Sequence, residues 1–93
     1  PNPSNQYVQI NIPSSSKGQA TICVYDLAGK GLYKTKIEIN EGLNQHSITE
    51  VGRWRPGIYM LSIDSEKGRQ WHKIIVMHPK NGNYKNVSAF SIL

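Results

Sequence analysis

The three histidines, His46, His72 and His78, are the side chains best suited to bind a metal ion or to act as a general base. Their spacing fits none of the patterns that bring imidazoles together on a zinc ion. His72 and His78 fall on the same side of one extended segment, but the strand between them spans roughly 20 Å, too far for one ion to bind both. We therefore expect no metal site and no bound cofactor.

The acidic residues and the single cysteine, Cys23, offer no better arrangement for catalysis. The acids fall at predicted turns or on polar strand faces, with no pair of carboxylates that the sequence places together for acid–base chemistry. Cys23 has no second cysteine for a disulfide and lies among apolar residues, which favours a buried, unreactive thiol. The sequence also contains no nucleophile-elbow, phosphate-binding or Cys–His motif, so we expect no enzymatic activity. The acids are Asp26, Glu38, Glu41, Glu50, Asp64 and Glu66.

Size and composition indicate the scaffold that holds these residues. With 93 residues, of which 38% are hydrophobic and 18% charged, the chain suits a single domain with one modest core. No apolar run approaches the ~20 residues of a membrane-spanning helix. The formal net charge is +5, but the lysines and arginines are scattered and form no basic run or nucleic-acid-binding motif. We expect neither a transmembrane segment nor a nucleic-acid partner.

Short segments of alternating apolar and polar residues, separated by glycine, proline and Asx turns, fill most of the chain. No window has a sustained helical period. The pattern predicts an all-β fold, an antiparallel β-sandwich of about seven strands with two hairpins, at 26–31 and 65–68. It also predicts that the segment from Pro13 to Gly18 ends the first strand, and that Arg55-Pro56-Gly57 forms a type II turn. The predicted strands are 7–12, 20–26, 32–39, 43–49, 58–64 and 70–77.

Two details of this pattern indicate how the strands pack. Residues 58–64 place Tyr59, Leu61 and Ile63 on one face and Ile58 with Met60 on the other, so both faces are partly apolar and the strand is predicted to be central. The connection before this strand is irregular. Its two large apolar residues, at positions 51 and 54, are expected to pin it to the core.

The aromatic residues allow two interpretations. Rings on a sandwich surface stack against sugars, which would make the domain an accessory carbohydrate-binding or adhesion module. Alternatively, the rings fill the core or cover hairpins, and strand alternation favours this by spreading them over several faces. The rings concerned are Tyr25, Tyr33, Trp54, Tyr59, Trp71 and Tyr84.

Four short segments occur in an order that is familiar from one family. They are Pro1-Asn2-Pro3-Ser4, Val24-Tyr25-Asp26-Leu27-Ala28-Gly29-Lys30, Pro56-Gly57-Ile58-Tyr59-Met60-Leu61 and Lys73-Ile74-Ile75-Val76. With these segments at this spacing, the chain resembles a type IX secretion system (Por secretion system) C-terminal sorting domain, type A, over about residues 1–77.

This resemblance implies an immunoglobulin-like sandwich that acts as a noncatalytic sorting signal. It implies a cargo protein ahead of Pro1 in the same chain, carried from the periplasm across the outer membrane to the cell surface. The implied partners are the type IX translocon and the outer-membrane sortase and shuttle proteins. The residues of this chain that match the family's sorting motifs are Pro1, Asn2, Pro3, Asp26, Gly29, Gly57, Tyr59, Lys73, Ile74, Ile75 and Val76.

The end of the chain departs from the family pattern, because members usually finish at the lysine-containing last strand. We therefore divide the chain into a sorting domain at 1–78 and a C-terminal extension at 79–93. The extension is either an added edge strand or a disordered tail. The Asn81-Gly82 pair is typical of a hairpin turn and favours the edge strand.

Overall fold

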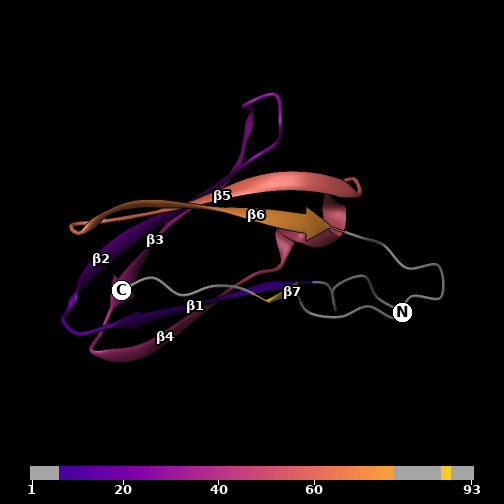
Figure 1. Ribbon diagram of the computed structural model, residues 1–93. Coiled ribbons are helices and arrows are strands. Elements are labelled where there is room, and N and C mark those ends of the chain that lie inside the picture. Colours follow the sequence, from indigo (N-terminus) through magenta and orange to yellow (C-terminus); the bar gives the residue numbers. More distant parts are fainter. Residues whose placement is uncertain (1–6, 77–86, 89–93) are drawn as a thin grey trace.

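Seven strands in two stacked sheets form the part of the chain that the computed structural model describes, residues 7–76 and 87–88 (Figure 1). A four-stranded sheet of order β3-β2-β5-β6 packs over a three-stranded sheet of order β4-β1-β7. Neighbouring strands are antiparallel, except that β7 runs parallel to β1. The predicted immunoglobulin-like β-sandwich of about seven strands is confirmed. The bounds are β1 Val8–Ser14, β2 Gly18–Tyr25, β3 Gly31–Ile39, β4 Gly42–Ile48, β5 Gly57–Ser65, β6 Gly68–Val76 and β7 Val87–Ser88.

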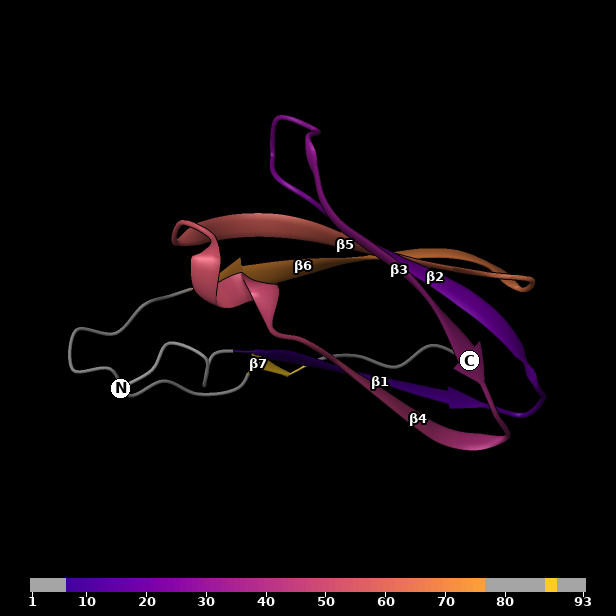
Figure 2. The ribbon, with the colours of Figure 1, turned by 180° about the vertical axis from the view of Figure 1, so that it is seen from behind.

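The core lies between the two sheets, whose layered arrangement is also clear from behind (Figure 2). Strands β1 to β6 contribute residues from one face, as the pleat of a β-strand requires. In β1, for example, Val8, Ile10 and Ile12 are buried whereas Gln9 and Asn11 are partly exposed, so the predicted alternation is confirmed. The largest fully buried side chains come from both sheets. They are Val8, Ile10, Ile22, Val24, Ile48, Leu61, Ile63 and Ile74.

Both predicted hairpins are confirmed, and the first is closed by a local hydrogen-bond network. The Asp26 carboxylate accepts hydrogen bonds from the backbone N–H groups of Ala28 and Lys30, both at 2.9 Å. Gly29 has a φ of 92°, a left-handed conformation that side chains disfavour. The Asx turn and the glycine therefore explain why the chain reverses here.

Two local predictions are wrong. Strand β1 does not end before Pro13 but continues through it, with Pro13 opposite Leu43 of β4. Among the described residues, β7 pairs with β1 only at Val8 and Gln9, so none of the described strands borders Pro13 on the side away from β4, where a missing N–H donor is tolerated. No type II turn forms at Gly57. Its φ of 157° is far from the roughly +80° of that turn, and Gly57 is already the first residue of β5.

The connection from β4 to β5, one of those that pass from one sheet to the other, contains a turn of 3-10 helix, η2 (Glu50–Arg53), which the strand pattern does not predict. The expectation that its apolar residues anchor it is confirmed, because Val51 is buried and Trp54 packs against the core. The chain thus leaves β4 in one layer and enters β5 in the other.

The C-terminal extension is described only at β7, which lies beside β1 as an edge strand of the smaller sheet. The predicted turn at Asn81-Gly82 and the residues Met77, His78 and Tyr84 lie outside the described residues. The division of the chain at residue 78 stays a prediction.

Candidate functional site

Two of the four motif segments are hairpin partners in the structure. Strands β5 and β6 are antiparallel, with Gly57 opposite Val76 and Tyr59 opposite Ile74. The Gly-x-Tyr segment and the last-strand segment, sixteen positions apart along the chain, therefore form one ladder of backbone pairs. They act as a single structural unit.

The first-hairpin segment lies at the same end of the four-stranded sheet. Tyr25 pairs with Met60 of β5, and Met60 pairs with Lys73 of β6, which makes a row of three residues across three strands. Asp26 follows Tyr25 directly, and the turn that it begins projects beyond the sandwich, away from the three-stranded sheet (Figures 1 and 2). The structure thus brings three of the four segments together. The fourth, Pro1, Asn2 and Pro3, lies outside the described residues.

Tyr59 has a structural role in this arrangement. Its ring is buried and lies 5.2 Å from the ring of Trp54, centroid to centroid. Its hydroxyl donates a hydrogen bond to the backbone carbonyl of Arg55, four residues earlier. A tyrosine at the start of a strand that bonds back to the preceding corner is a known feature of immunoglobulin-type sandwiches. Tyr59 therefore holds the entry to β5 against the core.

The last-strand segment divides between the core and the surface. Ile74 and Val76 point into the core, whereas Lys73 and Ile75 face outward on the alternate positions of β6. Ile75 is 47% exposed, which is unusual for a large aliphatic side chain in the middle of a motif. Half of this segment stabilises the fold, and the other half is available for contacts.

Apolar residues that are exposed or partly exposed extend from Ile75 over the outer face of the sheet. Five of them form what we call the outer strip, which spans β2, β5 and β6. On it, the rings of Tyr25 and Trp71 lie 5.8 Å apart, and the guanidinium of Arg69 lies 5.8 Å from the Trp71 ring. The Arg69 guanidinium donates bidentate hydrogen bonds to the Asp64 carboxylate, the shortest at 2.9 Å, and these hold Arg69 in place. The outer strip is Tyr25, Ile58, Met60, Trp71 and Ile75.

Sequence reasoning did not identify this strip, although a signal for it exists. The alternation within β5 and within β6 was recognised, and the turn from Ser65 to Gly68 was predicted. A two-residue turn between those residues also fixes which residues pair, and it places Ile58 opposite Ile75 and Ser62 opposite Trp71. The alternation and this register together place the outward-facing apolar residues of β5 and β6 side by side.

Tyr33 contributes to the packing between the two sheets. The Tyr33 hydroxyl and Nε2 of His46 are hydrogen bonded at 2.8 Å, which joins β3 of one sheet to β4 of the other. Burial lowers the pKa of His46, and the charge of Glu50 opposes this shift. Burial likewise raises the pKa of Tyr33. The predicted spread of rings over several faces is confirmed, with Tyr25 and Trp71 as the pair that meets on the outer face.

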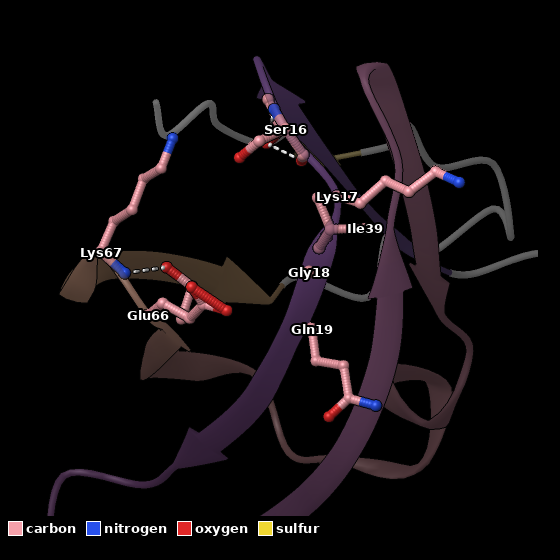
Figure 3. A pocket seen from close by; sticks show the side chains of 9 residues that line it. Ser16, Lys17, Gly18, Gln19, Ile39, Glu66 and Lys67 are labelled. Atoms are coloured by element: carbon pink, nitrogen blue, oxygen red, sulfur yellow. Dashed lines mark hydrogen bonds between the residues drawn. The ribbon is translucent and has the colours of Figure 1, made fainter.

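A small pocket lies at the opposite end of the sandwich, between the β1–β2 connection and the β5–β6 turn (Figure 3). Its cavity of about 40 Å³ has room for only a few water molecules. Figure 3 shows the side chains of Lys17 and Lys67 extending in different directions, so they do not converge on a common ligand. Within 7–76 and 87–88, no three His, Cys, Asp or Glu residues gather as a metal site would require. The same residues contain no helix long and apolar enough to cross a membrane.

A comparison with protein families identifies a match. A family model described as the secretion system C-terminal sorting domain matches residues 1–77. No curated protein and no solved structure matches the chain. The matched region contains the first six strands and all four motif segments.

Proposed function

The chain belongs to the secretion system C-terminal sorting domain family, and on that basis we propose that it is a noncatalytic signal that directs a cargo protein through the type IX secretion system to the cell surface. Family membership itself supports the role of a sorting signal and export to the cell surface or beyond. Our proposal adds the route, from the periplasm across the outer membrane. It also adds the cargo, which precedes Pro1 in the same chain.

The observation that carries the proposal is the family match over residues 1–77 together with the meeting of three motif segments at one end of the sheet. A signal of this kind needs a folded surface rather than a reactive pocket, because a receptor reads exposed backbone and side chains. The proposed partners are the type IX translocon and the outer-membrane sortase and shuttle proteins.

The motif residues divide into two groups under this proposal. Tyr59, Ile74 and Val76 hold the β5–β6 hairpin on the core, so they act through the fold. Lys73 and Ile75 face outward and are available to a receptor. The exposed turn that begins at Asp26, with Gly29 in its left-handed conformation, presents a third surface at the same end. We propose that recognition uses the outward-facing group.

A reporter fusion tests the proposal directly. Residues 1–93 are fused behind a periplasmic reporter in a bacterium with a working type IX system, and reporter at the surface is measured by its digestion in intact cells. We expect surface delivery, and we expect Ile74→Asp, which buries a charge in the core, to abolish it. A strain without the translocon is the control. Periplasmic retention of the unmodified fusion would contradict the proposal.

The alternative is an accessory carbohydrate-binding or adhesion module, and the Tyr25–Trp71 pair on the outer face favours it. Trp71 is half exposed and available for stacking, whereas Trp54 packs against the core. A glycan array separates the two functions. Binding that Trp71→Ala removes supports the module, and an array without binding excludes it for the sugars tested.

A further inference from the structure

The outer strip is an apolar surface that the described part of the fold does not explain. Ile58 and Ile75 are cross-strand partners, 42% and 47% exposed, and Trp71 on the same face of β6 is 50% exposed. The outward face of an antiparallel sheet is normally polar, because it contacts water. Contiguous apolar side chains on such a face mark interaction sites.

The charges beside the strip are positive. Lys73 lies between Trp71 and Ile75 on the outer face of β6, and Lys34 of β3 lies beside Cys23 of β2. The two outward-facing carboxylates of the four strands, Asp64 and Glu38, lie toward the other end of the sheet. Each already has a partner, since Asp64 binds Arg69 and Glu38 accepts a hydrogen bond from Gln19. A ligand that approaches the strip therefore meets Lys73 and Lys34, neither of which forms an ion pair within residues 7–76 and 87–88.

The aromatic end of the strip is held by contacts within the sheet before anything binds. Ser62 of β5 faces outward between Cys23 and Trp71, yet it is only 2% exposed. The rings of Tyr25 and Trp71, from the strands on either side of β5, meet at 5.8 Å and account for this cover. Arg69, held by Asp64, packs on the Trp71 ring. A surface that is already ordered loses little conformational entropy on binding.

We propose that the outer strip docks a protein partner that presents an apolar ridge flanked by carboxylates. Carboxylates complement Lys73 and Lys34, and the ridge covers Ile58, Met60 and Ile75. That this protein belongs to the secretion machinery rests on the proposed function. A glycan would leave the aliphatic end of the strip in water, because only the rings stack on sugars. A second copy of this chain would bring cations against cations.

A binding experiment with defined probes tests the surface. The probe is a peptide with a leucine-rich centre flanked by glutamates, and its control has lysine at every glutamate. The domain is titrated with each peptide while its backbone amide resonances are followed by NMR. We expect shifts on the outer face of the four-stranded sheet, including Lys34 of β3 and Lys73 of β6, with the acidic peptide, weaker binding at high salt, and none with the lysine peptide.

Surface variants give this experiment its controls. Ile75→Ser and Lys73→Glu are each expected to weaken binding of the acidic peptide about tenfold. Leu43→Ser is the matched control, because Leu43 is an exposed aliphatic residue on β4 of the other sheet, and it should leave affinity unchanged. Thermal melts should show all three variants folded, since their side chains lie at the surface. Equal affinity for the unmodified domain and Ile75→Ser would overturn the proposal.

Two further measurements test whether a second copy of this chain or a glycan binds the outer strip instead of an acidic protein. Sedimentation of the domain alone detects self-association, and titration with alginate, an anionic polysaccharide, detects glycan binding. We expect a monomer and no binding of alginate. Self-association or alginate binding that Ile75→Ser abolishes would overturn the assignment of the strip to an acidic protein.

The reporter fusion separates this proposal from the proposed function. If the unmodified fusion reaches the surface and the Ile75→Ser and Lys73→Glu fusions do not, both proposals are supported. If all of these fusions reach the surface, the docking proposal fails and the sorting function stands. If the unmodified fusion stays in the periplasm, the sorting function fails, and the peptide titration still decides whether the strip binds an acidic ligand.

Discussion

The two faces of the β5–β6 hairpin contain similar residues in different surroundings. On the inner face, Leu61 and Ile74 are fully buried against the second sheet. On the outer face, Ile58 and Ile75 are nearly half exposed. The comparison teaches that the apolar character of a strand does not by itself indicate its role. A side chain stabilises the fold where a second layer covers it, and it is free to contact a partner where the second layer is missing.

The largest effect is expected when two adjacent residues of β5, one on each face, are separately replaced by alanine. Leu61→Ala removes a fully buried side chain and is expected to lower the free energy of unfolding by about 3 kcal/mol. Met60→Ala removes an outward-facing, partly exposed side chain and is expected to lower it by less than about 1 kcal/mol. Urea denaturation measures both. Equal losses would mean that the outer face is as structural as the inner one.

Removal of one hydroxyl from each face sharpens the comparison. Tyr59→Phe deletes the hydrogen bond to the Arg55 carbonyl and is expected to lower the free energy of unfolding by about 1 kcal/mol. The matched change on the outer strip, Tyr25→Phe, keeps the contact with Trp71 and removes a hydroxyl that lies beside Cys23 and Ser62 on a face open to water, so it should lower the free energy of unfolding by less than Tyr59→Phe does. A larger effect at Tyr25 than at Tyr59 would reverse our assignment of their roles.

We expect the pH dependence of stability near neutral pH to arise mainly from His46 and His72, whose side chains are only partly exposed. Burial lowers the pKa of both His46 and His72 below the usual 6.5, so the folded state binds fewer protons than the unfolded state. Their contribution to stability is complete above pH 6.5 and is lost as the pH falls below it. We therefore expect a lower melting temperature at pH 5 than at pH 8. His46→Gln should reduce that difference, and an unchanged difference would exclude His46 as a source.

The smallest effect is expected on the outer face. Hydrogen bonds from Arg69 lower the pKa of Asp64 below its usual 3.8, so any stability from this pair is lost only in strong acid. Both side chains are solvent-exposed, and exposed ion pairs contribute little. Asp64→Asn should therefore leave the melting temperature at pH 7 unchanged. A clear decrease would show that the pair does more than position Arg69 on Trp71.

The sequence predicted the parts of this structure that depend on local chemistry. Alternation identified six strands, and the Asx turn at Asp26 identified the first hairpin. The 3-10 turn was missed because its four residues are too few to show a period. The turn at Gly57 was misassigned because Pro-Gly suits several backbone conformations, and the choice among them depends on the pairing with β6.

The candidate site was only partly predictable, since it depends on contacts between distant segments. The family resemblance named Tyr59 and Lys73, but not which motif residues face the solvent. The hydrogen bond between Tyr33 and His46 joins two sheets, and no local pattern reports the packing of one sheet on another. The outer strip required the register of a hairpin as well as its alternation.

The register of the β5–β6 hairpin restricts how the gene for this domain can change during evolution. Because pairing starts at Ser65 and Gly68, one codon inserted into β6 beyond Gly68 would exchange its two faces, with Ile74 moved to the surface and Lys73 moved inward. A point mutation in this hairpin changes one side chain, whereas a single-residue insertion or deletion within a strand changes the face of every side chain beyond it. Among homologous genes, we expect length variation to collect in the segment from Ser14 to Lys17 and to be rare from Gly57 to Val76.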